Sequence, residues 1–251
     1  MISMSKLRYF LLILLIIPTQ IFSQSNFKID FESGLTWNGY NNIEVPNGSG
    51  TRFSLTEIAD PNQTSFYRIQ LLYTLNERHT FRLLYAPLKN SSEGVFNRDT
   101  NFAGTTFSDE TNFNGTYEFN SYRLTYRYLF SPDGKLVWGL GATAKIRDAR
   151  IQISDDDQSA KKTDLGFVPL INFKFDWHFS EYFSLLFAGD ALVSPGGQGR
   201  AEDVLLALRY YLEPELAFKL GYRILEGGAD VDEVYNFTLF HYALIGITVG
   251  F

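Results

Sequence analysis

The three histidines are the first candidates for chemistry, because histidine is the side chain most often used as a general base near neutral pH. His79 and His178 each adjoin a short polar turn, and His241 lies ten residues before the C-terminal residue. The chain contains no cysteine, which excludes a thiolate nucleophile, a thiolate metal site and any disulfide. We therefore predict no catalytic set, no metal site and no cofactor.

Two acidic runs are the other polar clusters that stand out. The first runs from Asp155 to Asp157, and the second comprises Asp230, Asp232 and Glu233. Runs of this kind are usually solvated, although carboxylates are also the ligands that calcium prefers. We interpret both runs as loop tips, with calcium binding as the alternative.

The N-terminus has the charge and apolar order of a secretory signal peptide. Two basic residues precede the apolar run from Tyr9 to Ile17, which is too short to span a membrane comfortably as a helix. We predict cleavage after Ser23, so that residues 1–23 are removed and residues 24–251 form one folded domain. The Gln24 that follows is similar to the first mature residue of exported proteins from Bacteroidota.

The mature chain is acidic and lacks a helical membrane span. Removing the signal peptide takes away Lys6 and Arg8 and no acidic residue, which lowers the formal net charge from −6 to −8. Nucleic acid, itself a polyanion, is therefore not an expected partner. After the signal, no apolar stretch approaches the ~20 residues of a spanning helix. Such a chain is either soluble in the periplasm or a β-barrel in the outer membrane.

Alternation of apolar and polar residues favours the barrel. It runs over 27–37, where Ser33 and Gly34 dilute it, and over 67–74, 121–128, 138–147, 172–177 and 218–223. A membrane barrel strand alternates lipid-facing apolar residues with lumen-facing polar ones over roughly ten residues. A soluble β-sandwich, whose strands also alternate, is the alternative. The length of several segments and the Tyr and Trp residues near their ends favour the membrane barrel.

Short turns and longer loops alternate between these segments. The short turns lie at 76–78, 131–134, 180–181 and 213–215, and the longer polar loops lie near 41–62, 90–112, 154–163, 194–200 and 226–233. Outer-membrane barrels have short periplasmic turns and longer external loops, so we predict an all-β fold, a single closed antiparallel transmembrane β-barrel of about ten strands. The predicted strands span 26–40, 63–76, 79–90, 113–130, 135–153, 163–178, 182–194, 199–212, 215–227 and 234–251. Residues 51–58 alternate weakly and are assigned to the first external loop, and a count of twelve strands is the alternative.

The C-terminal strand carries apolar residues at alternate positions and ends on an aromatic residue. These positions are Phe237, Leu239, Ile245, Ile247, Val249 and Phe251. The pattern resembles the assembly signal of outer-membrane proteins from Gram-negative bacteria. The resemblance implies a location in the cell outer membrane, recognition by the barrel-assembly machinery, and contact with outer-membrane lipid and lipopolysaccharide.

Alternation also assigns many charged side chains to the lumen. They are Lys28, Asp30, Glu32, Arg68, Arg82, Arg123, Arg127, Lys145, Arg147, Lys174, Asp176, Asp190, Asp203, Arg209, Lys219 and Arg223. An eight-stranded barrel is just filled by its side chains, whereas open porins need about sixteen strands. We therefore expect these charges to form a network of ion pairs in a plugged or narrow lumen, with an anion-preferring constriction as the alternative.

Some small outer-membrane barrels are enzymes, including lipid A deacylases and omptin proteases. His178-Phe179-Ser180 resembles the His-x-Ser pair of one deacylase family, but lies at a predicted periplasmic turn, whereas that family acts on the outer leaflet. His241 is predicted near the external interface and facing lipid, and Ala243 stands where the serine would be. We expect a non-enzymatic, porin-like barrel, structural or a narrow passage for small solutes, whose external loops can bind an unknown partner or mediate adhesion. An outer-leaflet lipid-modifying hydrolase is the alternative.

Overall fold

A computed structural model describes residues 26–61, 63–193 and 198–251, most of which lie in β-strands. The predicted signal peptide, residues 1–23, lies outside the described residues. Within the described ranges, no helix is long and apolar enough to cross a membrane.

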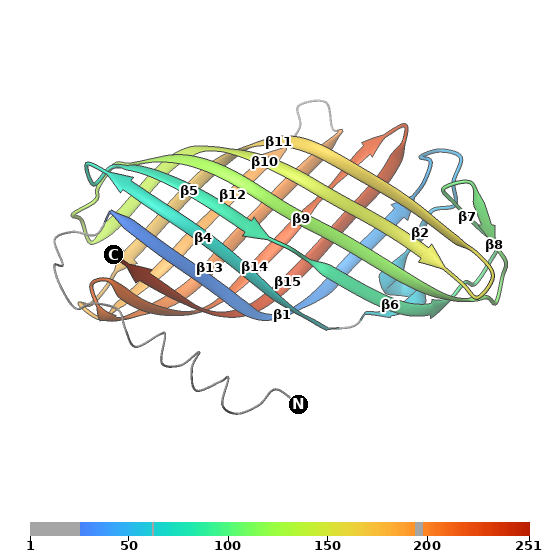
Figure 1. Ribbon diagram of the computed structural model, residues 1–251, viewed down its shortest axis with the longest axis horizontal. Helices are drawn as coiled ribbons and strands as arrows, with labels where there is room; N and C mark the ends of the chain where they lie inside the picture. Colours follow the sequence, from blue (N-terminus) through green and yellow to red (C-terminus); the bar gives the residue numbers. More distant parts are fainter. Residues whose placement is uncertain (1–25, 62, 194–197) are drawn as a thin grey trace, which may run out of the picture.

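Ten strands form a closed antiparallel barrel, as the sequence predicts. They are β1 (Phe27–Glu44), β4 (Thr64–Leu75), β5 (His79–Ala86), β9 (Asn112–Leu129), β10 (Leu136–Ser154), β11 (Ser159–His178), β12 (Phe183–Val193), β13 (Gly199–Glu213), β14 (Leu216–Val231) and β15 (Val234–Gly250). Each strand pairs with the next in this order, and β15 returns to pair with β1 from Gly250–Lys28 to Tyr235–Glu44. Figure 1 shows the barrel from the side, with the C-terminus at the end that carries the short turns.

The barrel is apolar outside and polar inside. On β9, Leu124 is 55% exposed, whereas its neighbours Arg123 and Thr125 are 3% and 1% exposed. A soluble β-sandwich buries its apolar face and exposes its polar one, so this arrangement is the reverse of the alternative that the sequence left open. Apolar residues therefore face outward and polar residues face the lumen, as in a barrel surrounded by lipid.

Aromatic side chains mark both edges of the apolar exterior. Toward the loop end, Tyr85 stacks on Tyr122 with ring centroids 5.2 Å apart, and Trp37 stacks on His241 at 5.6 Å. Toward the short turns, Phe130 stacks on Trp138 at 4.2 Å. Aromatic girdles of this kind lie at the two membrane–water interfaces of outer-membrane barrels.

One predicted strand is interrupted. The sequence predicts a single strand over 79–90, but β5 ends at Ala86 and a separate strand, β6 (Lys89–Val95), begins at Lys89. Pro87 lies between them, and proline has no amide hydrogen to continue the ladder. Both pieces pair with β9, so the wall of the barrel continues past the break.

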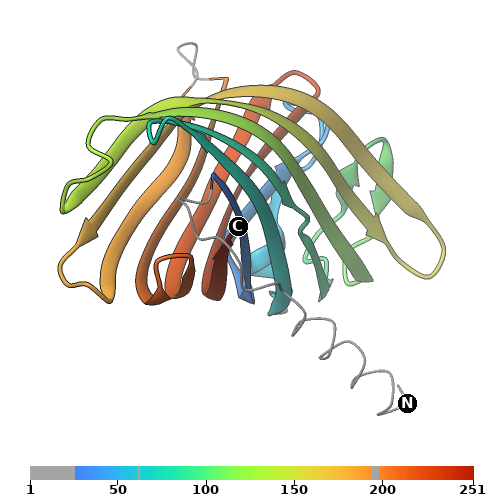
Figure 2. The ribbon, with the colours of Figure 1, turned by 60° about the vertical axis from the view of Figure 1, so that its left-hand side comes forward.

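The external loops differ from the prediction in two ways. The loops predicted at 154–163 and 226–233 are mostly strand, because β10 and β11 pair up to Ser154–Ser159 and β14 and β15 up to Val231–Val234. The loops predicted at 41–62 and 90–112 contain further elements, namely β2 (Phe53–Ser54), α2 (Leu55–Ile58), β3 (Ala59–Pro61), β7 (Thr100–Phe102) and β8 (Thr105–Phe107). Figures 1 and 2 show β7 and β8 beside the far end of the β10–β11 hairpin.

These loop elements form an external cap with an aromatic core. Phe96 stacks on Phe113 with ring centroids 4.2 Å apart and meets Phe53 edge-on at 5.9 Å. Phe102 and Phe107 are fully buried in the same cluster. Polar composition alone suggested solvated loops, but burial of these aromatic rings holds the cap together on one side of the barrel mouth.

Candidate functional site

A layer of ion pairs crosses the middle of the lumen. Arg68 on β4 and Arg123 on β9 place guanidinium nitrogens 2.9 and 2.7 Å from the carboxylate of Asp203 on β13. Arg123 also lies 2.7 Å from Asp190 on β12. β4 and β9 are far from β12 and β13 around the barrel, so these pairs join opposite walls through its interior.

Further charges complete this ionic layer. Glu32 on β1 is fully buried and lies 2.8 Å from Arg223 and 2.7 Å from Lys219. Arg82 lies 2.7 Å from Asp190. The layer as a whole consists of Asp30, Glu32, Asp190 and Asp203 with Arg68, Arg82, Arg123, Lys219 and Arg223. Buried charges are stable only when paired and hydrogen-bonded, and here opposite charges surround one another.

Four more of the predicted lumen charges form a group nearer the periplasmic end. Asp176 pairs with Arg209 and lies 3.2 Å from Lys174. Lys28 lies at the rim, 3.5 Å from Glu215. A cavity of about 450 Å³ is lined by residues of both this group and the ionic layer. The periplasmic part of the lumen is therefore hollow up to the ionic layer.

The remaining three cations differ in their surroundings. Arg127 donates a hydrogen bond of 3.2 Å to Asn172, and Arg147 pairs with Asp164. Lys145 makes neither an ion pair nor a hydrogen bond within the described part of the chain, although only 3% of it is exposed. Its ammonium lies 4.7 Å from the centre of the Phe119 ring.

The histidines occupy the two edges of the membrane. His79 accepts or donates a 2.9 Å hydrogen bond with Tyr126, and His178 lies 3.8 Å from Asp176, both toward the periplasmic turns. His241 lies on the lipid-facing side, 2.5 Å from the hydroxyl of Tyr222 and stacked on Trp37. Interfacial packing accounts for the contacts of His79 and His241, whereas His178 lines the periplasmic cavity of the lumen.

Gly39 makes room for the His241 ring. The pairing of β1 with β15 shifts by one residue between Asn38 and Tyr40, which places Gly39 in a β-bulge. A Cβ atom on Gly39 would lie 2.6 Å from Nε2 of His241. A larger residue would therefore displace the ring from Trp37.

An apolar layer covers the ionic layer on its external side. It comprises Phe66, Phe119, Leu225, Phe240 and Tyr242, from four different strands. Phe66 and Tyr242 meet edge to face with centroids 4.7 Å apart. The space between this layer and Arg68 and Arg123 of the ionic layer holds only about 10 Å³. A cavity of that size accommodates about one water molecule. The lumen is thus closed by two successive layers, one apolar and one ionic.

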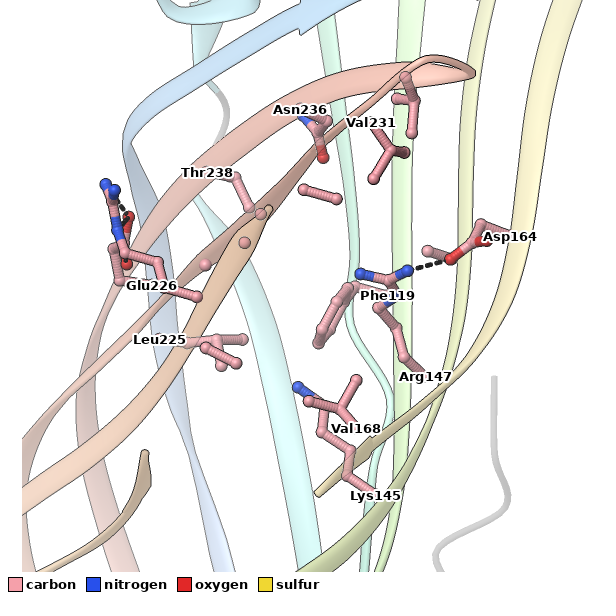
Figure 3. A pocket seen from close by; sticks show the side chains of 18 of the residues that line it. Phe119, Lys145, Arg147, Asp164, Val168, Leu225, Glu226, Val231, Asn236 and Thr238 are labelled. Atoms are coloured by element: carbon pink, nitrogen blue, oxygen red, sulfur yellow. Dashed lines mark hydrogen bonds and ion pairs between the residues drawn. The ribbon is translucent and has the colours of Figure 1, made fainter. Parts of the chain in front are cut away.

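An external cavity of about 360 Å³ lies above the apolar layer. Phe119, Leu225 and Phe240 contribute to its floor, and Val168, Leu192 and Val234 to its walls. Figure 3 shows Lys145 reaching toward this cavity between Phe119 and Val168, with Arg147 turned toward Asp164. The cavity is therefore mostly apolar. Of its lining cations, Arg147, Arg150 and Arg200 each have an acidic partner, whereas Lys145, which is buried, and Lys162, which is half-buried, make no ion pair with the described residues.

The sequence indicated that Lys145 belongs to the lumen but not that it stands apart from the other charges. The signal that could have found the cavity is the run Leu239 to Leu244, where apolar residues occupy both faces of the strand. Phe240, Tyr242 and Leu244 point inward there and are buried. An apolar inner face in a barrel otherwise lined by charges indicates an inner seal.

Comparisons with known proteins concern the fold alone. No protein-family model matches this sequence, and no curated protein matches it. Among solved structures, the chain is similar to the outer membrane protease OmpT from Escherichia coli, with a TM-score of 0.58 and 11% identity over 93% of this chain and 99% of that one. It is also similar to the translocator domain of the autotransporter NalP from Neisseria meningitidis, with a TM-score of 0.47 and 9% identity over 98% of this chain and 95% of that one.

The closed barrel, its apolar exterior with aromatic edges and its charged interior agree with the architecture of outer-membrane proteins. OmpT, which matches with a TM-score of 0.58, is an outer-membrane protein of the same overall fold. The protein is therefore a ten-stranded β-barrel of the outer membrane.

Proposed function

We propose that this barrel is a non-enzymatic binding protein whose external cavity holds a small organic anion against Lys145. The observation that carries the proposal is Lys145, a residue only 3% exposed that lines the cavity and makes no ion pair with the described residues. Burying an unpaired charge costs free energy, and a bound anion removes that cost. A mostly apolar pocket with a few convergent polar groups is the usual form of a small-molecule site.

The closed lumen supports binding rather than free passage. The apolar layer and the ionic layer lie between the external cavity and the periplasmic one, and the ion pairs join opposite walls. A solute that crossed would have to separate several buried ion pairs, each of which is costly to break. The cavity therefore suits a ligand that enters and leaves on the external side.

The final strand and the lipid contacts are further parts of this proposal. Ile245 and Phe251 are 64% and 54% exposed on the outside, in reach of lipid and of an assembly factor. We propose that the alternate apolar positions from Phe237 to Phe251 are read by the barrel-assembly machinery. The external belt around Trp37 and His241 is then the surface that contacts lipopolysaccharide.

Anion binding tests the proposed function. Isothermal titration of sodium hexanoate into the barrel in detergent micelles is expected to show binding, and Lys145→Gln should weaken it at least about tenfold, since a charged hydrogen bond contributes about 1.5–3 kcal/mol. Lys145→Arg keeps the charge and should retain binding. The matched control is Lys161→Gln, which removes an exposed lysine from the same hairpin and should leave the affinity unchanged. Equal hexanoate affinity in wild type and Lys145→Gln would contradict the proposal.

A further inference from the structure

The wall of the barrel is incomplete on one side of the external cavity. β11 and β12 pair from His178–Ser184 up to Ile171–Ala191. The next positions, Leu170 and Leu192, are strand residues without pairing to each other, while β11 continues upward to Ser159 with β10 as its partner. In the described part of the chain, the upper half of β11 is therefore a free edge.

Pro169 lies directly above the point where this pairing ends. Proline lacks an amide hydrogen and occurs in sheets at edges and irregular positions. On the other side of the opening, the upper residues of β12 pair only with β13, where Leu192 is the partner of Ala201. The two edges thus diverge above Ile171 and Ala191.

The external cavity lies beside this opening. Alternation along β11 makes Val168 lumen-facing and places Phe167 on the lipid side, where it is 65% exposed. Both residues line the same cavity as Lys145, and Leu192 lines it from the opposite edge. The cavity therefore has lining residues on both edges of the opening.

The outside of the opening is apolar at the height of the lipid headgroups. Phe167 lies about 28 Å above the periplasmic turn, at about 3.3 Å per residue and a strand tilt near 40°. Leu165, two residues higher, is 74% exposed. By contrast, the neighbouring strand β10 already presents the exposed charge of Asp148 outward at the position paired with Leu165. The apolar outer surface therefore extends further toward the external side along the free edge of β11 than along the neighbouring strand β10.

We propose that the ligand is a single-chain anionic amphiphile that enters sideways from the outer leaflet, through the opening between β11 and β12. Its anionic group lies at Lys145, and its alkyl chain runs past Val168 and Leu192 toward Phe167 and the lipid. This inference rests on the proposed anion site and adds the chain and the route. A cavity of about 360 Å³ holds the headgroup and the first part of one chain.

Photo-labelling from a membrane tests the chain and its position. The protein is reconstituted in phosphatidylcholine vesicles that contain palmitic acid with a diazirine on its chain, and labelled residues are found by mass spectrometry. Adducts are expected on β11 and β12 around Val168 and Leu192, and at least tenfold fewer in Lys145→Gln than in Lys161→Gln. The corresponding diazirine alcohol, which has no charge, should give labelling that does not depend on Lys145. Labelling by the acid that is equal in both lysine variants would overturn the proposal.

Closing the opening tests the route. Because the chain has no native cysteine, the double variant Leu170→Cys/Leu192→Cys can be joined across the opening by a disulfide or a short bis-maleimide. The joined protein should lose at least tenfold of its palmitate labelling but bind hexanoate within twofold of the reduced protein, since hexanoate can enter from the barrel mouth. Leu192→Trp, which fills the opening without a cross-link, should act in the same direction.

The outcomes separate the two proposals. Full palmitate labelling of the joined protein, with hexanoate binding intact, would overturn the lateral route and leave the anion site standing. Loss of Lys145-dependent binding for hexanoate as well as palmitate would overturn both.

Discussion

Arg123 on β9 lies 2.7 Å from Asp203 on β13, so these two residues join opposite walls of the barrel across its lumen. Asp203 also accepts from Arg68 and Arg223, and it is 2% exposed. One carboxylate thus contacts three guanidinium groups from three different strands, and Glu32 and Asp190 share in balancing their charge. The lumen is closed at this point by the paired side chains themselves.

Asp203→Asn should destabilise the barrel. Asparagine keeps the shape of the side chain but removes the negative charge that Arg68, Arg123 and Arg223 share, and breaking a buried pair costs about 3–5 kcal/mol. Urea unfolding of the refolded protein in micelles, followed by tryptophan fluorescence, measures the loss. Asp157→Asn, at the exposed tip of the β10–β11 hairpin, is the control and should change the free energy of unfolding by less than about 0.5 kcal/mol. Equal stabilities of the two variants would show that the ion pairs do not hold the walls together.

His241→Ala should leave lipid A unchanged. His241 contacts Tyr222 and Trp37 on the lipid-facing surface, so its loss should cost about 1–2 kcal/mol of stability and no activity. The mass spectrum of lipid A from expressing cells checks this. His79→Ala is matched to it, because His79 makes the same kind of contact with Tyr126 at the periplasmic edge. If expression of the wild type altered lipid A acylation, and His241→Ala but not His79→Ala abolished the change, the barrel would be an outer-leaflet enzyme.

Deleting Phe251 should lower the amount of assembled barrel in the outer membrane. The Phe251 ring is 54% exposed, while its backbone amide donates a 3.0 Å hydrogen bond to Phe27. Phe251→Ala keeps that hydrogen bond and removes the ring, so it separates recognition from stability. We expect both variants to accumulate less heat-modifiable protein in outer-membrane fractions, although Phe251→Ala should refold in micelles as well as wild type. Normal outer-membrane levels of both variants would contradict the role of the terminal aromatic residue.

The barrel itself could be predicted from the sequence because its signals are local. Each strand alternates on its own, and each periplasmic turn is marked by its own polar residues, as at Ser131–Gly134. The final strand, from Val234 to Gly250, also matches its predicted bounds closely. Local errors have local causes, such as Pro87, which divides the strand predicted over 79–90.

The site could not be predicted in the same way, because its contacts join residues far apart in the chain. Alternation along the strand predicts that Arg123 points inward. The tilt and register of the closed barrel decide that it meets Asp203 and that Lys145 forms no ion pair with the described residues. The external cap depended on the packing of Phe96 against Phe113, which the polar composition of the segment concealed. The opening beside β11 could not be predicted either. It depends on where the pairing between β11 and β12 stops, which only the closed barrel shows.

The electrical conductance of the purified protein in planar lipid bilayers tests most directly whether the apolar and ionic layers close the lumen. We predict either no ionic current or small currents that favour anions, because the lumen carries an excess of positive charge. Large, stable, cation-selective currents from the wild-type protein would contradict the closed lumen and the account of the site built upon it.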